Sequence, residues 1–360
     1  PGLASRLPGT APGIERDQRM NILITGGAGF LGRTLAQTLL QRGQLGGRSI
    51  ATLALADLVS PSEAALTQDP RVQVNTGDLL ASLPALMAAQ RWDTVFHLAS
   101  AVSGECEANF DLGLHANLDS TRALLDACRA QTIAGHAPPL FFFSSSVAVY
   151  GSDAAIPLPA VVGDDTLPTP QSSYGIHKFV CEQLVADYTR KGFIDGRAAR
   201  LMTVSVRPGR PNGAASSFLS GLFREPLAGQ PSPCPVDQDT EVALSSPANT
   251  ITGILAVMEA SREAFGGRTA INLPALTVSV REMLQALQDL AGPEVMSLIR
   301  DEPDAGVKKI VQAWPSRFES PRAAALGLSP DPDFGSVLRQ YVQHHAEAVT
   351  HPAARQRLGL

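Results

Sequence analysis

Short apolar segments alternate with segments of helical periodicity along most of the first 210 residues of the chain. The segment MNILITG, residues 20–26, is a short apolar run and predicts a buried strand. In the segment that follows, Leu31, Leu35 and Leu39 recur at helical spacing, and Gly43 predicts the end of this helix. Alternation of this kind is typical of helices packed on a parallel sheet, so we expect an α/β protein with a doubly wound parallel sheet.

The same pattern predicts the remaining elements of this region. Further strands are expected at 49–57, 71–78, 94–100, 139–149 and 201–209, and further helices at 79–90, at 106–131 and from about residue 172. After about residue 210 the sequence becomes rich in Pro, Gly and Ser, with helices expected near 249–263, 278–290 and 333–348. We therefore expect a nucleotide-binding domain at 20–210, a smaller C-terminal substrate-binding lobe at 211–345 and a tail at 346–360.

Composition narrows the class of protein. The chain has 44% apolar residues, scattered basic residues and a net charge of −5, which argues against a nucleic-acid partner. No apolar run approaches the roughly 18–20 residues that a membrane span needs. The four cysteines are widely spaced and form no CxxC pair, which favours reduced thiols in the cytoplasm over disulfides or a zinc site. Residues 1–19 contain no continuous hydrophobic segment and are expected to be a disordered or non-native lead-in rather than a secretory signal.

A glycine-rich segment, ITGGAGFLG, lies between the first strand and the first helix. Gly26, Gly29 and Gly32 would let the backbone turn tightly and approach a pyrophosphate, which the N-terminus of the following helix attracts. The spacing therefore predicts a Rossmann-type dinucleotide site, with an ordinary strand-to-helix turn as the alternative.

Two aspartates follow later strands of the predicted sheet. Asp57 ends the second strand, where its carboxylate can accept hydrogen bonds from both adenosine ribose hydroxyls and would repel a 2′-phosphate. This position favours NAD over NADP, although an aspartate at a strand end can also form a turn. Asp78 would meet the adenine edge or cap the helix that follows it.

The segment SSYGIHKFVCE places Tyr174 and Lys178 one helical turn apart on one face. A lysine ammonium favours the phenolate form of a neighbouring tyrosine, whose ordinary pKa is about 10, and a nearby oxidised nicotinamide does the same. The pair therefore predicts a general base that works near neutral pH. Ser146, at the carboxyl end of a predicted strand, would hold the substrate oxygen, while Ser144 and Ser145 would lie near the cofactor or complete the strand end.

Together these motifs resemble the extended short-chain dehydrogenase/reductase superfamily. The matching pieces are TGGAGFLG, Asp57, GDL at 77–79, HLAS at 97–100, Asn117, SSSVAVYG and YGIHK. The resemblance implies catalytic Ser146, Tyr174 and Lys178, with Lys178 also holding the nicotinamide ribose and Asn117 lying in the active-site helix. The implied NAD-binding set is Gly26, Gly29, Phe30, Leu31, Gly32, Asp57, Asp78, Leu79, Leu98, Ala99, Ser100, Asn117, Ser144, Tyr174 and Lys178.

The sequence also narrows the activity within this superfamily. Val147 and Ala148 stand where the superfamily's dehydratases carry an acidic pair, so a dehydratase is not expected. The segment SVRPGRPNGAASSF is similar to that of the L-threonine dehydrogenases, in which a glycine-rich loop with paired hydroxyl residues receives a carboxylate. The substrate set expected from this likeness is Ser103, Ser146, Tyr174, Arg210, Ser216 and Ser217. The alternative is a solvated loop in which Arg207 or Arg210 only caps a strand.

Several longer segments, such as VSGECEANFDLGLHANLDSTRALLDACR, resemble the superfamily's D-erythronate dehydrogenases. This resemblance implies oxidation of the C2 hydroxyl of a small aldonate, D-erythronate to 2-dehydro-D-erythronate, with NAD as the cofactor. A sugar-nucleotide 4-epimerase and a non-catalytic NAD-sensing protein are the alternatives. Family members commonly form homodimers through the helices that carry Asn117 and Tyr174. Leu124, Leu125, Val180 and Leu184 suit either this interface or helix–sheet packing.

The histidines add no expected site. His97 is expected to be packed within its strand, and His177 is expected at the surface, facing away from Tyr174. His344 and His345 have no cysteine or carboxylate cluster around them, so no metal is predicted.

Overall fold

The computed structural model describes residues 19–209 and 215–360. Its largest sheet has eight strands in the order β11-β7-β6-β5-β1-β3-β2, with β4 also paired to β3. All of these pairs are parallel except that of β2 with β3. The strands are β1 (Arg19–Thr25), β2 (Gln44–Leu45), β3 (Arg48–Asp57), β4 (Val72–Thr76), β5 (Thr94–His97), β6 (Leu140–Ser146), β7 (Asp195–Leu201) and β11 (Ile271–Asn272). The chain order reverses between β1 and β5, which is the position where open α/β sheets bind ligands.

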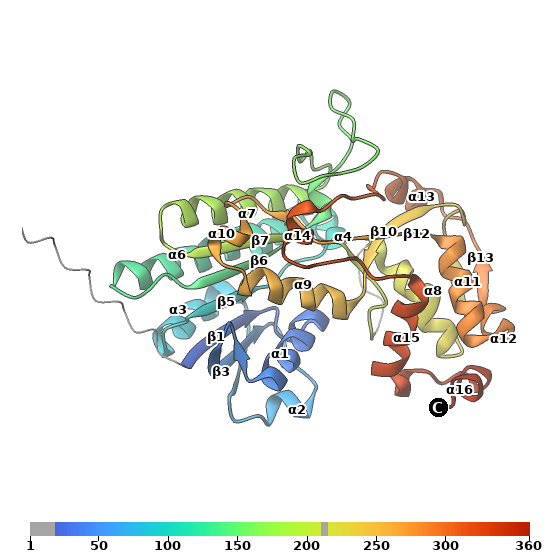
Figure 1. Ribbon diagram of the computed structural model, residues 1–360, viewed down its shortest axis with the longest axis horizontal. Coiled ribbons are helices and arrows are strands. Elements are labelled where there is room, and N and C mark those ends of the chain that lie inside the picture. The colour runs from blue at the N-terminus through green and yellow to red at the C-terminus, as the bar shows by residue number, and fades with distance from the viewer. Residues whose placement is uncertain (1–18, 210–214) are drawn as a thin grey trace, which may run out of the picture.

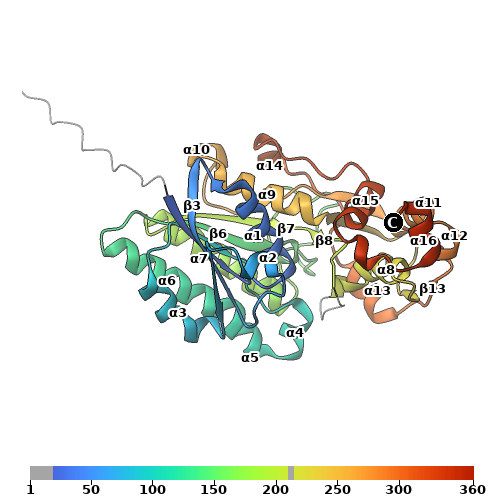
Figure 2. The ribbon, with the colours of Figure 1, turned by 90° about the horizontal axis from the view of Figure 1, so that it is seen from below.

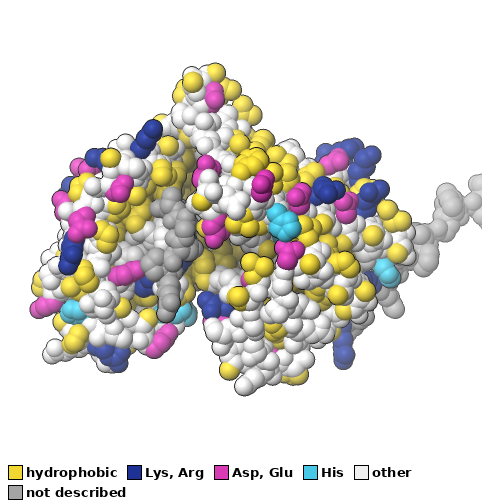
Figure 3. All heavy atoms as spheres, turned by 180° about the vertical axis from the view of Figure 1, so that it is seen from behind, with side chains coloured by type: hydrophobic (Ala, Val, Ile, Leu, Met, Phe, Trp, Pro, Cys, Tyr) yellow, Lys and Arg dark blue, Asp and Glu magenta, His cyan; other side chains and the backbone are white. Residues whose placement is uncertain are grey.

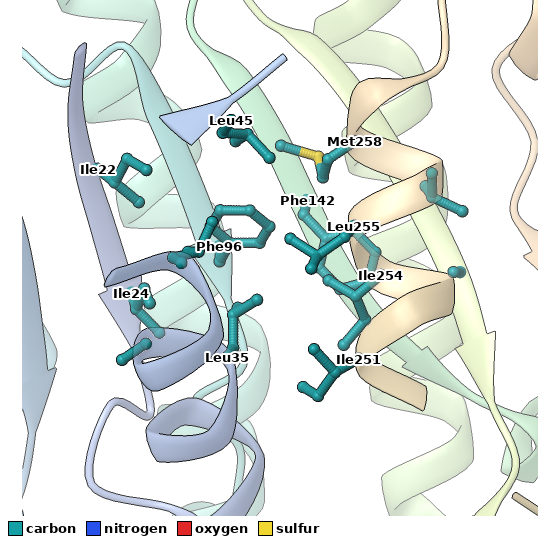
Figure 4. Close-up of a cluster of buried hydrophobic side chains, with 14 of the residues drawn as sticks. Ile22, Ile24, Leu35, Leu45, Phe96, Phe142, Ile251, Ile254, Leu255 and Met258 are labelled. Carbon is teal, nitrogen blue, oxygen red and sulfur yellow. The ribbon is translucent and has the colours of Figure 1, made fainter. Parts of the chain in front are cut away.

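Helices cover both faces of this sheet (Figures 1 and 2). Side chains alternate between the two faces along β1, so Ile22 and Ile24 point to one face and Leu23 to the other. On the first face they pack against α1 (Phe30–Arg42) and α9 (Pro247–Glu259), as Figure 4 shows for Leu35, Ile254 and their neighbours. The other face is covered by α3 (Leu79–Ala89), α6 (Ser120–Ile133) and α7 (Ser173–Arg190). The predicted doubly wound fold is therefore confirmed.

A second hydrophobic cluster lies beyond the large sheet and draws residues from Val206 to Ala354. It contains a three-stranded sheet, β8 (Thr203–Val204), β10 (Glu241–Ser245) and β12 (Leu276–Ser279), and a two-stranded sheet, β9 (Ser232–Cys234) and β13 (Ile299–Asp301). Its helices are α8 (Phe218–Leu227), α11 (Val280–Ala291), α12 (Pro293–Met296), α13 (Ala305–Gln312), α15 (Phe334–His344) and α16 (Pro352–Leu358). Figure 3 shows that the surface is hollowed between this lobe and the part that holds the large sheet.

The two clusters do not divide the chain at a single residue. Helix α9, β11 and α14 (Pro321–Ala325) come after residue 210 but lie with the large sheet. Conversely, Val349 and Ala354, from the predicted tail, belong to the lobe cluster. The predicted boundaries at 210 and 345 therefore remain a prediction. The short helices α2 (Ala64–Thr67) and α10 (Arg262–Phe265) complete the first part of the molecule.

Two predicted elements were wrong in their extent. The sixth strand predicted along the chain, 201–209, is β7 at Asp195–Leu201 in the large sheet. Beyond Leu201, only Thr203–Val204 of the predicted segment forms a strand, and this strand lies in the lobe sheet. Arg197 and Arg200 hide the apolar character of β7, although both are buried and paired with a carboxylate. Arg197 pairs with Asp195 on the same strand, and Arg200 pairs with Glu182 on α7.

The helix predicted at 106–131 is also divided. It comprises α4 (Ser103–Ala108), α5 (Phe110–Gly113), a π-helical turn (Leu114–Asp119) and α6. The break falls at Asn109, which has an extended backbone and whose side chain caps α5 by accepting from Leu112 N.

Among the described residues, no helix combines the length and the apolar character needed to cross a membrane. The same part of the chain holds no group of three or more His, Cys, Asp or Glu side chains that could bind a metal ion.

Candidate active site

The glycine loop joins β1 to α1 in a tight turn, in which Gly32 packs against Gly26. Gly26 has a φ of +72°, and its N–H donates to Ala56 O at 2.9 Å. A Cβ atom added to Gly32 would lie 2.1 Å from Gly26 O, so the first turn of α1 packs directly on the loop. The N-cap residue, Gly29, offers no side-chain cap, and the first turn of α1 carries no acidic residue. The free N–H groups of this helix end are therefore suited to an anion such as a pyrophosphate.

Asp57 is held beside this loop at the end of β3. Its Oδ2 accepts from Ala28 N at 2.9 Å, and its Oδ1 accepts from Leu58 N at 2.7 Å. The carboxylate is therefore fixed at the sheet edge, next to the turn that would carry the pyrophosphate. This place fits the ribose-binding role that its sequence position predicts.

Asp78 caps α3, which was one of its two predicted roles. Its Oδ1 accepts from Ala81 N at 3.0 Å, and its Oδ2 forms a hydrogen bond of 2.8 Å with His115 Nε2. Both contacts lower the pKa of the Asp78 carboxyl, with that of His115 the stronger. His115 was not predicted as a site residue, because 37 residues separate it from Asp78 and no local spacing connects them. The adenine-binding role of Asp78 stays a prediction.

The segment after β5 lies against the glycine loop. A Cβ on Gly26 would meet Ala99 N at 2.7 Å and Leu98 C at 2.8 Å. Asn117, buried in the π-helical turn, accepts at Oδ1 from Ala101 N at 2.7 Å and from Ser100 Oγ at 3.0 Å. The structure thus brings two predicted cofactor motifs into contact and ties one of them to the helix that carries Asn117.

Of the other residues predicted to bind the cofactor, Phe30 and Leu31 begin α1 and Leu79 begins α3, all three partly buried.

Helix α7 begins directly above the end of β6. Its N-cap, Ser172, accepts from Gly175 N at 3.1 Å. A Cβ on Gly175 would lie 2.1 Å from Ala148 O, so only glycine allows this close approach. The approach brings Tyr174 near Ser146 and Ser100, whose hydroxyls lower the pKa of its phenol. Ser146, in turn, accepts from Ala148 N at 3.1 Å.

Lys178 lies buried beneath the tyrosine. Its Nζ donates to Ser144 O at 2.8 Å and stands 5.0 Å from the ring centroid of Phe143 and 5.5 Å from that of Tyr174. Burial lowers the pKa of Lys178 to about 8. Ser144 also donates to His97 O at 3.1 Å, so this serine completes the strand end.

The pKa of Tyr174 is higher than the Tyr174–Lys178 pair alone predicts. Burial raises it to about 12, although the hydroxyls of Ser146 and Ser100 and the charge of Arg207 act in the opposite direction. Desolvation of the phenolate therefore outweighs the groups that favour it. In the protein by itself, Tyr174 is a protonated phenol at neutral pH.

The substrate residues lie on the lobe side of this phenol. Arg207 is partly buried, and its Nη2 donates to Ser216 Oγ at 3.1 Å. Its backbone is held by Ser220 Oγ, which accepts from Arg207 N at 3.0 Å, and by Arg224 Nη1, which donates to Arg207 O at 3.0 Å. Arg207, for which the sequence suggested only a strand-capping role, carries a charge that lowers the pKa of the Tyr174 phenol.

For the other predicted substrate residues, the structure gives only the helix on which each lies. Ser217 follows Ser216 at the start of α8, and Ser103 begins α4. Arg210 lies outside the described residues.

The predictions for the two histidines near the candidate site had different outcomes. His97 is packed in β5 as predicted, with hydrogen bonds from its ring to Thr25 Oγ1 at 2.6 Å and Thr121 Oγ1 at 2.8 Å. The surface position predicted for His177 was wrong: the residue is only 3% exposed. The chain turns at Asn109 and lays α5 over α7, so the His177 ring contacts Gly113 and lies 6.4 Å from the ring of Phe110.

A glycine loop at the switch point of a doubly wound sheet, with a Tyr–Lys pair beside it, defines a dinucleotide-dependent enzyme of the Rossmann type. The chain belongs to the NAD dependent epimerase/dehydratase family, whose sequence profile matches residues 22–271. The family predicted from the motifs is therefore confirmed, and with it the class of enzyme, an NAD-dependent dehydrogenase acting on a CH–OH group.

Individual relatives cover nearly the whole chain. The chain is 48% identical over 332 residues to a D-erythronate dehydrogenase of Cupriavidus necator, covering 90% of this chain and 98% of that protein. It is 39% identical over 328 residues to a D-erythronate dehydrogenase of Haemophilus influenzae, covering 90% and 99%. A solved structure described as the nucleoside-diphosphate-sugar epimerase from Agrobacterium tumefaciens is similar with a TM-score of 0.86 and 35% identity, covering 95% of this chain and 99% of that one.

The residues of the site fit the NAD that the family's description names. The glycine loop leaves no room for a side chain at Gly32, and the helix end behind it has no acidic residue to repel a phosphate. The Asp57 carboxylate is anchored at the ribose position.

Proposed function

We propose that this protein oxidises the C2 hydroxyl of a small aldonate to a 2-keto acid with NAD, and that D-erythronate is the substrate. The observation that carries the proposal is the position of Tyr174 between a buried ammonium and an arginine held from the lobe. Lys178 Nζ stands 5.5 Å from the ring centroid of Tyr174, and Arg207 is held by Ser216. The hydroxyl of Ser146 and the charge of Arg207 both lower the pKa of the Tyr174 phenol. A hydroxyl acid needs both a base for its hydroxyl and a cation for its carboxylate. The similarity to two D-erythronate dehydrogenases supports this choice of substrate.

In this reaction Tyr174 takes the proton of the C2 hydroxyl while Ser146 orients the hydroxyl oxygen. NAD, which the glycine loop and Asp57 would hold, would supply the hydride acceptor for C2 and a positive charge near the phenol. Lys178 contributes a second positive charge beneath the Tyr174 ring. Because burial raises the pKa of Tyr174 to about 12, these two charges have to offset the desolvation of the phenolate.

Arg207 would hold the substrate's carboxylate together with the Ser216 hydroxyl. Its guanidinium is positioned by the hydrogen bond to Ser216, and two further contacts fix its backbone. A fixed planar guanidinium can bind a carboxylate through two parallel hydrogen bonds. Ser103, Ser217 and Arg210 remain predicted members of this pocket.

A sugar-nucleotide 4-epimerase is the second candidate, and the described name of the Agrobacterium tumefaciens structure favours it. An epimerase would return the hydride to its substrate, so no NADH would accumulate. The two functions are therefore separated by the fate of the reduced cofactor.

The decisive experiment follows NADH at 340 nm with NAD and a panel of four- to six-carbon aldonates, with L-threonine and UDP-glucose as controls. We expect rapid NADH formation with D-erythronate and little with either control. Absence of NADH with every aldonate, together with an epimerised sugar nucleotide in the control tube, would instead support the epimerase.

The role of Tyr174 is tested by Tyr174→Phe, which removes the hydroxyl and keeps the ring. We expect kcat to fall by at least about a hundredfold, the lower end for general base catalysis, with little change in NAD affinity. Tyr188→Phe is the matched control, since Tyr188 lies on the same helix but donates to Asp126. Substantial turnover by Tyr174→Phe would refute the assignment.

We also propose that the protein forms a homodimer through the helices that carry Asn117 and Tyr174. Leu124 and Leu125 are buried against the sheet, whereas Phe110 on the adjoining α5 and Ile176 and Val180 on α7 are exposed large apolar side chains. Such residues are suited to an interface between two copies. Sedimentation analysis of the protein and of Val180→Glu tests this, and a monomer in both cases would contradict it. A cytoplasmic location stays a prediction from the cysteine content.

A further inference from the structure

One buried ion pair lies immediately behind the catalytic residues. Arg200 on β7 binds Glu182 on α7 through two parallel hydrogen bonds, Nε to Oε1 at 2.9 Å and Nη2 to Oε2 at 2.7 Å. The side chains of Glu182 and Arg200 are only 1% and 6% exposed. Ser145, the residue before Ser146, donates from Oγ to Glu182 Oε1 at 2.5 Å.

The same arginine also reaches the far side of Ser146. Arg200 Nη1 donates to Tyr150 Oη at 2.5 Å, and Tyr150 Oη donates to Asn272 Oδ1 at 3.0 Å. Tyr150 directly follows the 3₁₀ turn Val147–Val149 that begins after Ser146. In the sheet, Arg200 stands opposite Ser145 on one side and Asn272 on the other. The ion pair is therefore attached to the chain both before and after Ser146.

Stability alone does not account for such a pair. Removing two charges from water is expensive, and well-packed apolar residues of similar volume often serve as well or better. A second ion pair, Arg197 Nη1 with Asp195 Oδ2 at 3.0 Å, lies at the opposite end of the same strand, away from the site. The Glu182–Arg200 pair differs because Glu182 binds Ser145, the residue before Ser146. Glu182 also lies one helical turn after Lys178 on α7.

We propose that Glu182 and Arg200 are positioning residues, which hold the Ser146 strand end against α7 so that Ser146, Tyr174 and Lys178 keep their relative places. This inference rests on the proposed function, because it assigns a task in the same proton transfer. Neither residue touches the substrate. They act through Ser145 and Tyr150, which flank Ser146, and through the helix that they share with the Tyr–Lys pair.

The pair also contributes to the charge around Lys178. Burial lowers the pKa of Lys178, and Cys181, Cys106 and the carboxylate of Glu182 oppose this, with Glu182 the weakest of the three. The ionisable groups that interact with this ammonium come from three elements packed around it: Cys181 and Glu182 on α7, Cys106 on α4 and His97 on β5. Of these, only Glu182 is a carboxylate. Its loss would make Lys178 lose its proton at a lower pH and with it the support for the phenolate.

The test replaces Glu182 by glutamine in the full-length enzyme, which removes the charge and keeps the shape. We expect kcat for NADH formation to fall at least about tenfold, a modest part of a general-base effect, with KM for the acid changed less than about twofold. We also expect the pH optimum to move to lower pH. Asp195→Asn is the control, since it breaks the remote ion pairs of Asp195 with Arg197 on the same strand and with Arg262.

The controls separate positioning from a purely structural role. If Glu182→Gln and Asp195→Asn lower the melting temperature alike and leave the pH optimum unchanged, the proposal is wrong. If Glu182→Gln does not fold, Ser145→Ala serves instead, because it removes one hydroxyl and leaves the ion pair intact. We then expect kcat to fall about threefold, equivalent to a weak hydrogen bond, with an unchanged melting temperature. An unchanged kcat in that variant would overturn the proposal.

A readout without turnover keeps this inference distinct from the proposed function. In NAD-bound protein carrying ¹³C-labelled tyrosine, the ring resonances of Tyr174, assigned with Tyr174→Phe, should shift in Glu182→Gln but not in Asp195→Asn. If the wild-type enzyme oxidises no aldonate but this shift is seen, the proposed function fails and the positioning role stands. Unchanged Tyr174 resonances with an active wild-type enzyme give the reverse result.

Discussion

The two halves of the site lie at one edge of one sheet but are built in opposite ways. The nucleotide side consists of backbone: Gly26 and Gly32 bring chain against chain, with no room for a Cβ between them. The substrate side consists of charge: Lys178, Glu182 and Arg200 are all buried, and each is hydrogen-bonded. The first side is shaped by the absence of side chains, and the second by side chains that carry charge out of water.

This difference implies opposite sensitivities. The glycine loop should fail when an atom is added, because a backbone contact cannot relax as a flexible side chain does. The substrate side should fail when a charge is lost, because its partners would remain buried and uncompensated. Substitutions on the two sides therefore test whether the contrast holds.

The largest effect is expected from Gly32→Ala. The added methyl would lie 2.1 Å from Gly26 O, so the loop must open. Losing two hydrogen bonds to a charged pyrophosphate, at about 2 kcal/mol each, should weaken NAD binding roughly a thousandfold. Isothermal titration calorimetry with NAD measures this directly.

Gly29→Ala is the control within the same loop. Its added methyl would stand 3.2 Å from Gly26 O, and its φ of −66° suits any residue. We expect it to bind NAD far better than Gly32→Ala does. Equal affinities for the two variants would show that close packing of the loop is not what the site needs.

The next effect concerns stability. Because burial lowers the pKa of Lys178 from its ordinary value near 10.5 to about 8, the folded state binds the proton less well than the unfolded state does. The contribution of Lys178 to stability is therefore present above pH 10.5, declines as the pH falls, and is lost below pH 8. Over that window the wild type should lose about 3 kcal/mol relative to Lys178→Met.

Urea unfolding of both proteins at several pH values between 7.5 and 10.5 measures this difference. Lys309→Met, at an exposed position, is the control for the loss of a lysine. A Lys178→Met difference that is independent of pH would mean that the lysine is not desolvated in the folded protein. Lys178→Met should also be inactive. Measuring its activity beside its free energy of unfolding separates the contribution of Lys178 to catalysis from its effect on stability.

An intermediate effect is expected for Arg207→Met. Loss of a charged hydrogen bond to the substrate carboxylate, worth about 2 kcal/mol, should reduce kcat/KM roughly thirtyfold, mostly through KM. Arg207→Lys should recover only part of it, because an ammonium cannot bind a carboxylate through two parallel bonds. Steady-state kinetics with D-erythronate decides the matter. An unchanged KM in Arg207→Met would shift attention to Arg210.

The smallest effect is the dependence of rate on pH. Burial raises the pKa of Tyr174, so the phenolate fraction grows with pH over the physiological range. Oxidation should therefore rise by up to about tenfold per pH unit between pH 6 and 7. It should then level off and decline above about pH 8, as Lys178 loses its charge. Initial rates at saturating NAD test this, and a profile that falls between pH 6 and 7 would contradict a tyrosine base.

Much of the nucleotide side could be predicted, because its signals are local. Strand β1, the glycine triplet and helix α1 are adjacent in the chain, so their spacing alone predicts the turn between the strand and the helix. The predicted end of α1 at Gly43 is confirmed, and Gly43 has the positive φ of a helix C-cap. Local pattern failed where a strand carried charge, since β7 reads as DGRAARL and was placed six residues too late.

The amino-acid sequence by itself determined the class of this protein, because glycine spacing and the Tyr–Lys spacing are properties of a few consecutive turns. The tertiary structure decided the rest. It buried His177 under α5, joined His115 to Asp78 and Arg200 to Glu182, and set Arg207 facing Tyr174. It also raised the pKa of Tyr174 where the pair alone suggested a lower value. Burial and charge pairing depend on residues that are distant along the chain and meet only when it folds.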